Sequence, residues 1–156
     1  MRKSRMLLMV VALVSCLALN VQAVFADQVH HSQHIALTPI GGAPLRTGFV
    51  ENTHANGPTI YAHEVYVLNG ATPNTTYHVA LNGYLSSATC SGAPDLVIPA
   101  ANVLANAAGN GKGQKFFYPS DVAGLNGMTV HIVWTLTKDG ATQPAYATGC
   151  EIVVLD

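Results

Sequence analysis

The stretch AHEVYVLNGATPNTTYHVAL, residues 62–81, decides the fold class of this chain. In its first half, Ala62, Glu64, Tyr66 and Leu68 alternate with a second set of side chains. A two-residue period is typical of a β-strand whose two faces meet different surroundings. This half is therefore predicted to be a strand.

The second half of the stretch repeats the pattern after a turn. Tyr77, Val79 and Leu81 alternate with smaller or polar residues. The segment between the two halves is rich in residue types that favour turns: Asn-Gly at residues 69–70 and Thr-Pro-Asn at residues 72–74. The stretch is therefore read as strand, turn and strand, and a helix is excluded.

The run PNTTYHVAL, residues 73–81, resembles the corner of fibronectin type III and related immunoglobulin-like sandwiches. The resemblance implies that Pro73 opens the corner, that the Tyr77 ring packs inward and that its hydroxyl bonds backbone upstream. The turns at residues 106–113 and 123–127, each ahead of a strand, are similar to those of secreted bacterial immunoglobulin-like domains. The resemblance implies the architecture and leaves the strand order open.

Outside this stretch, short strands are expected and no long segment has a helical period. The strands are predicted at residues 35–37, 48–51, 114–118, 129–137 and 146–155; residues 52–58 and 85–99 are read as connections, and 101–107 are weakly patterned. With turn signals between strands and only 10% charged residues, the sequence predicts an all-β, antiparallel, two-sheet sandwich. Its core is expected to contain Tyr66, Leu68, Tyr77, Val79, Leu81, Phe117, Val130, Ile132, Trp134, Leu136, Ile152 and Val154.

The first 26 residues have the pattern of a secretory signal peptide. Basic residues precede an apolar run at 6–19, and small residues follow it. Cleavage is expected after Ala26, with Ala23 as the near competitor. The sequence thus predicts a signal-peptide helix over residues 1–26, and a single domain over 27–156 that is secreted or held in the cell envelope.

Two alternatives concern the membrane. A membrane-spanning anchor is disfavoured because Asn20 and Gln22 interrupt the run before the roughly 20 apolar residues that a span needs. Residues 13–16 (Leu-Val-Ser-Cys) resemble a bacterial lipobox, in which Cys16 would carry a lipid anchor. A polar tether usually follows such a cysteine, but residues 17–19 continue the apolar run, which favours an incidental cysteine.

The charge and the cysteine content indicate which partners and which chemistry are not expected. Residues 27–156 hold eight acidic and four basic residues, a net charge of −4, and no basic patch, so nucleic acid is not an expected partner. Cys90 and Cys150 remain as a pair after cleavage, and in an exported chain they predict a disulfide. Their spacing is far from Cys-x-x-Cys, which disfavours thiol catalysis.

The sequence contains no recognisable catalytic motif. His63 and Glu64 resemble the opening of the His-Glu-x-x-His zinc signature, but position 67 is valine and the segment reads as a strand. There is no Gly-x-Ser-x-Gly run, and the serines after the signal lack a neighbouring base. The protein is therefore not expected to be an enzyme.

Two sets of histidines could bind copper or zinc, since imidazole suits both metals. The first set, His63, His78 and His131, lies on strand faces opposite the large apolar residues, and its rings would converge only if the three strands were neighbours. The second set, His30, His31 and His34, lies in the polar start of the domain, residues 27–34, which is expected to be flexible.

Two functions follow from these features. The favoured one is an exported, non-catalytic module with a structural, binding or adhesion role at the cell surface or outside the cell, which presents loops or an edge strand to another protein, a glycan or the cell envelope. The alternative is a small exported copper- or zinc-binding protein that uses the histidines above.

Overall fold

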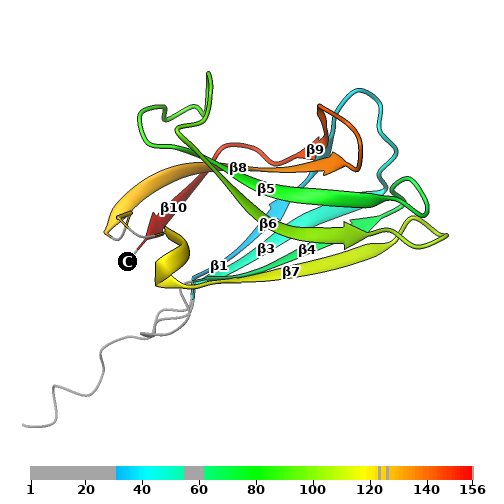
Figure 1. The fold of residues 1–156 in the computed structure, drawn as a ribbon, viewed down its shortest axis with the longest axis horizontal. Helices are drawn as coiled ribbons and strands as arrows, with labels where there is room; N and C mark the ends of the chain where they lie inside the picture. Colours follow the sequence, from blue (N-terminus) through cyan, green and yellow to red (C-terminus); the bar gives the residue numbers. More distant parts are fainter. Residues whose placement is uncertain (1–30, 55–61, 123, 126, 156) are drawn as a thin grey trace, which may run out of the picture.

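Ten β-strands and one short 3₁₀-helix make up the described part of the chain (Figure 1). The computed structural model describes residues 31–54, 62–122, 124–125 and 127–155. The expected signal-peptide helix lies outside these residues. Within them, no helix has the length and apolar character needed to cross a bilayer.

The strands form two antiparallel sheets packed face to face, which confirms the predicted sandwich. The first sheet has the order β1 (His31–Ala36), β3 (Thr47–His54), β4 (Ala62–Asn69) and β7 (Gly111–Phe117). The second has the order β2 (Thr38–Pro39), β9 (Pro144–Ala147), β8 (Met128–Lys138), β5 (Thr76–Tyr84) and β6 (Leu96–Leu104), and β10 (Glu151–Leu155) also pairs with β8. The helix η1 (Pro119–Val122) lies between β7 and β8 in the chain.

The core lies between the sheets and is built from the inward-facing residues of each strand. Trp134, in the middle of β8, is fully buried. Ten of the twelve predicted core residues are buried: Tyr66, Leu68, Tyr77, Val79, Leu81, Phe117, Val130, Ile132, Trp134 and Leu136. The two-residue period was thus a sound guide for β4, β5 and β8.

The prediction for the last strand was wrong. Ile152 and Val154 are 56% and 53% exposed, whereas Val153 between them is 4% exposed. The reason is an extra residue: Ala147 pairs with Thr135 and Glu151 with Ile132, so the three residues between β9 and β10 lie opposite two residues of β8. Such a bulge reverses which face each later side chain occupies.

The connection predicted over residues 85–99 was also wrong in its last part, because β6 begins at Leu96. Pro99 made the segment read as a loop, since proline cannot donate a hydrogen bond to a neighbouring strand. β6 is an edge strand, and its register with β5 shifts close to Pro99. A proline is tolerated at such an irregular edge.

Two strands near the start are longer than predicted. β1 begins at His31, four residues before the expected strand, and pairs along its length with β3. Strand β3 continues to His54, so residues 52–54, which were expected in a loop, belong to the strand. Both extensions, residues 31–34 and 52–54, consist of polar residues, so no apolar alternation indicated a strand there.

Two predicted cross-links are present. Cys90 and Cys150 form a disulfide with Cα atoms 5.6 Å apart, as predicted. The ring of Tyr77 is buried, and its hydroxyl accepts a hydrogen bond from the backbone N–H of Thr72 at 3.3 Å, the geometry that the family resemblance implies. The same hydroxyl lies 3.1 Å from that of Tyr146, which ties the start of β5 to β9.

Candidate functional site

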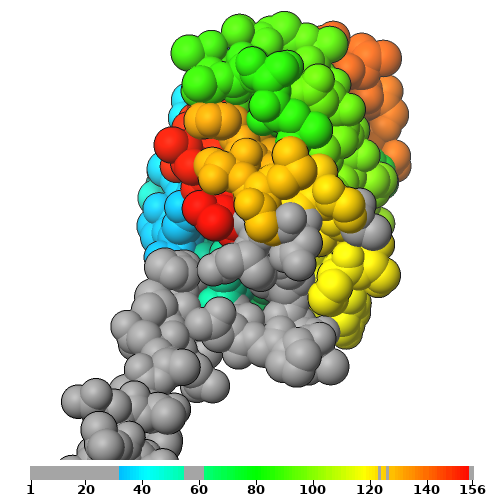
Figure 2. All heavy atoms as spheres, turned by 90° about the vertical axis from the view of Figure 1, so that its left-hand side faces the viewer, coloured from blue at the N-terminus to red at the C-terminus, as the bar shows by residue number. Residues whose placement is uncertain are grey.

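A cleft opens between the two sheets at the end of the sandwich where η1 lies. Figure 2 looks onto this end, with η1 in yellow, the start of β8 in gold and β10 in red. The cleft measures about 470 Å³, including the part open to solvent. Strands of both sheets line it, together with Val122 of η1 and Leu125 after it. Apart from Asn52, His54, Glu64 and Gly83, the described residues that line it are apolar.

Glu64 is the polar centre of this cleft. It lies on the inward face of β4 between Ala62 and Tyr66, and it is only 2% exposed. Trp134 Nε1 of the opposite sheet donates a hydrogen bond to Glu64 Oε2 at 2.8 Å, and the Tyr66 hydroxyl donates to the same oxygen. No hydrogen bond from a described residue reaches the other oxygen, Oε1.

Burial changes the protonation of this carboxyl group. Removal from water raises the pKa of Glu64 to about 7, although the hydrogen bonds from Tyr66 and Trp134 oppose the rise by stabilising the charged form. The same burial, with the neighbouring carboxylate, raises the pKa of Tyr66, which therefore stays neutral. Near neutral pH the cleft thus holds a carboxyl group that can gain or lose a proton.

Asn52 adds a second acceptor beside Glu64. The two residues are direct partners in the β3–β4 register, so their side chains lie on the same face of the sheet. Asn52 is 1% exposed, and its Nδ2 lies 3.1 Å from Nε2 of His54. Its Oδ1 is buried without a hydrogen-bond partner. A buried acceptor without a partner is costly, and it marks a place where a donor is missing.

A lysine lies in register with Glu64 but does not neutralise it. Lys115 on β7 is the cross-strand partner of Glu64. Its Nζ lies over the ring of Phe117, 5.4 Å from the centroid, and within the described residues it makes no ion pair with the carboxylate. The carboxyl group is therefore held by neutral donors alone.

The site is not predictable from the sequence alone. The one signal for it is that Glu64, a charged residue, shares a strand face with the core residues Tyr66 and Leu68. Asn52 falls in a segment whose sequence predicts a loop, so nothing in the sequence indicates that it lies beside Glu64.

The structure does not bring His63, His78 and His131 together. His63 lies on the outer face of the first sheet, where its ring stacks on Phe116 with centroids 4.2 Å apart. The other two lie on the second sheet at opposite ends of the β5–β8 pair, where His78 is opposite Thr137 and His131 is opposite Tyr84. His78 is exposed, with ring nitrogens 2.8 Å from Asn102 Oδ1 and 3.2 Å from Asp139 Oδ1.

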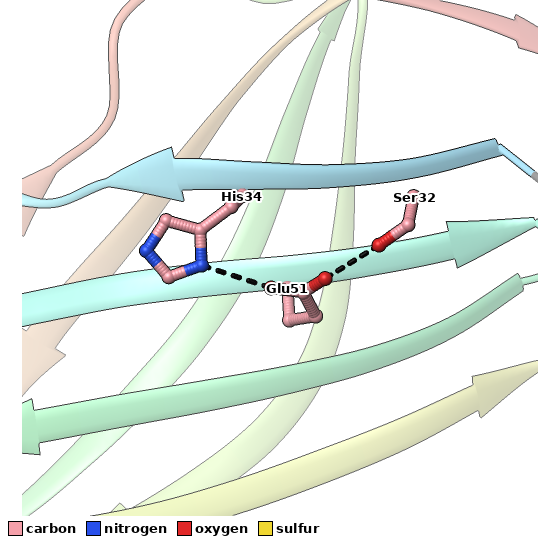
Figure 3. A network of polar contacts seen from close by, with 3 residues as sticks. All are labelled: Ser32, His34 and Glu51. Atoms are coloured by element: carbon pink, nitrogen blue, oxygen red, sulfur yellow. Dashed lines mark hydrogen bonds and ion pairs between the residues drawn. The ribbon is translucent and has the colours of Figure 1, made fainter.

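Two histidines of the second set, His31 and His34, lie on β1. His30 lies outside the described residues, and His31 is the first residue of the strand. His34 Nδ1 lies 2.9 Å from Glu51 Oε2 on the exposed outer face of the first sheet. Figure 3 shows Ser32 and His34 both directed at Glu51.

This exposed group resembles a catalytic triad in composition but differs from one in geometry. The Ser32 hydroxyl donates to Glu51 and not to the imidazole of His34. A serine nucleophile needs that hydroxyl on the histidine that removes its proton. The hydrogen bonds from Ser32 and His34 lower the pKa of Glu51, so it remains a carboxylate.

No three His, Cys, Asp or Glu side chains gather into a possible metal site in the part of the chain that the structure describes. Comparison with known proteins adds no relative, since no family model, curated protein or solved structure matches the chain. The cleft around Glu64 is therefore the candidate site on its geometry alone.

Proposed function

We propose that the protein is an exported, non-catalytic binding module that takes a small ligand between its two sheets. The observation that carries the proposal is the cleft between the sheets, with an apolar lining and one buried carboxyl group. Pockets for small ligands typically have apolar walls and a few polar groups that fix orientation.

Export is supported by sequence and cross-linking. The first 26 residues have the signal-peptide pattern. The Cys90–Cys150 disulfide is the type of bond that persists in oxidising surroundings outside the cytosol. Both features favour a site of action outside the cell or in its envelope.

An immunoglobulin-like family assignment is supported by the strand order. In immunoglobulin folds, strands B and E are neighbours in one sheet, and strands C, F and G are neighbours in the other. Here β4 and β7 are neighbours in one sheet, while β5, β8 and the last two strands are neighbours in the other. Chain order and sheet membership correspond, with β4 in the place of B and β5 in the place of C.

The binding surface assigned here differs from the loops or edge strand expected from the sequence. The edge strand β6 exposes the apolar side chains of Val97 and Leu104, but on an open surface. The cleft instead offers apolar surface between the two sheets, where a ligand would be buried on more than one side. This makes a small, partly apolar molecule the better match.

The test is binding of six-carbon probes to the disulfide-bonded protein. We expect n-hexanol at millimolar concentration to shift the indole N–H resonance of Trp134, the sole tryptophan. Val122→Phe, which adds bulk at the cleft, should weaken this binding, whereas Val67→Phe on the outer face of the first sheet should not. If n-hexanol, n-hexylamine and hexanoate all leave the Trp134 resonance unchanged, the cleft is not a binding site.

A further inference from the structure

We infer that the ligand of the cleft is an apolar molecule that carries a protonated amine, held by Glu64 and Asn52. This inference rests on the proposed function and names the ligand class. It follows from the chemistry of the polar atoms that line the cleft, from their burial and from the charge around them.

Two acceptor atoms of the cleft lining receive no hydrogen bond from the described residues. Asn52 Oδ1 is buried without a partner, and Glu64 Oε1 receives no hydrogen bond from the described residues. Because Asn52 and Glu64 are direct cross-strand partners, one group with several N–H donors can reach both. An ammonium group has three such donors and no acceptor.

The charge of the site points to the same ligand class. Among the described residues that line the cleft, Glu64 is the only acidic one and none is a lysine or arginine; the imidazole of His54 also lines it. Lys115, the basic residue in register, lies over Phe117 instead. A carboxylate with no cation beside it in an apolar cleft attracts a cation more strongly than it would in water, since the local dielectric is low.

The carboxyl group is also prepared in advance. Folding has already removed it from water, and Trp134 Nε1 and the Tyr66 hydroxyl hold Oε2 in one orientation. A ligand therefore does not have to desolvate or reorient this group when it binds. The apolar walls would take the hydrocarbon part of the same molecule.

An anionic ligand would meet the opposite situation. Its carboxylate would face Glu64 and the Asn52 oxygen, both of which repel negative charge. A neutral alcohol could donate one hydrogen bond, but without the attraction between opposite charges. The order of affinity expected at a fixed chain length is therefore amine, alcohol and then carboxylate.

The test compares n-hexylamine, n-hexanol and hexanoate by titration of the Trp134 indole resonance at about pH 8, above the pKa of about 7 of Glu64. We expect the amine to bind about tenfold more tightly than the alcohol, as a charge-assisted hydrogen bond would give. Glu64→Gln should remove this preference while n-hexanol still binds. Glu51→Gln, which removes the same charge from the outer face of the sheet, should retain it.

The outcomes separate the two proposals. If n-hexanol binds but the amine binds no better, or if the preference survives Glu64→Gln, the amine inference is overturned and the binding cleft stands. If none of the three probes binds, the binding cleft itself is overturned. Should Glu64→Gln fail to fold, Asn52→Leu provides the second variant, and it is expected to weaken the amine more than the alcohol.

Discussion

The indole N–H of Trp134 and the carboxylate of Glu64 join the two sheets of the sandwich through a hydrogen bond of 2.8 Å. Both side chains are buried, Trp134 completely and Glu64 to within 2%. A buried carboxyl group lowers the stability of the fold when it is charged. Hydrogen-bond donors such as the Trp134 indole offset part of that cost.

Stability should depend on pH through Glu64. The folded state raises its pKa from 4.5 to about 7, so between these values folding takes up a proton. The free energy of unfolding is therefore highest below the unfolded pKa, and it falls as the pH rises through the folded pKa, by about 3 kcal/mol. His54 and Lys115 are the other titratable groups near this carboxyl from neighbouring strands, and both remain in the variant used for comparison.

That variant is Glu64→Gln, which cannot ionise. Urea denaturation at about pH 5 and about pH 8 should show the fall in the wild-type protein and little of it in the variant. Parallel pH profiles for the two proteins would mean that Glu64 does not carry the effect.

Replacing Trp134 by phenylalanine should destabilise the protein by about 2–4 kcal/mol, because it leaves a cavity and removes a donor from Glu64. The loss of that donor should also move the Glu64 pKa further up, since the hydrogen bond opposes the effect of burial. Thermal and urea denaturation measure the first effect, and the midpoint of the pH profile measures the second. An unchanged midpoint would contradict the assigned hydrogen bond.

The bulge between β9 and β10 predicts opposite results at adjacent positions. Val153 faces the core and Val154 faces solvent. Val153→Ala should cost about 1–3 kcal/mol of unfolding free energy, whereas Val154→Ala should stay within about 0.5 kcal/mol. Urea denaturation measures both losses. A larger loss for Val154→Ala than for Val153→Ala would contradict the bulge and support the regular alternation expected from the sequence.

Loss of the disulfide should lower the melting temperature. Cys90 and Cys150 close a loop of 60 residues, for which chain entropy gives about 4 kcal/mol. The double substitution to serine and chemical reduction of the wild-type protein should lower the melting temperature by similar amounts. An unchanged melting temperature in both experiments would show that the bond does not stabilise the fold.

The sequence predicted the fold class well where strands have two clearly different faces. The alternations around Tyr66, Tyr77 and Trp134 gave the correct buried faces. It failed for β6, where proline weakened the pattern, and for β10, where one extra residue reversed the alternation. Neither pairing partners nor bulges are visible in a single strand's pattern.

The candidate site was harder to predict for the same reason. Whether a cleft forms depends on how far apart the two sheets lie at the end of the sandwich. The pattern of residues within one strand does not predict that separation. Histidines are recognisable metal ligands in a sequence, yet the described members of the two sets lie on strands of both sheets. Glu64 and Asn52 lie side by side through the β3–β4 register, which became known only from the structure.

The most direct test of the account is the pKa of the Glu64 carboxyl group with and without n-hexylamine, measured by ¹³C NMR on protein with labelled glutamate. Only three glutamates are present, Glu51, Glu64 and Glu151, and Glu64→Gln identifies the resonance in question. We predict a pKa of about 7 without the amine and a lower value when the amine is saturating, because a bound cation stabilises the carboxylate. A carboxyl group that titrates near 4.5, or one whose pKa does not respond to n-hexylamine, would contradict the account.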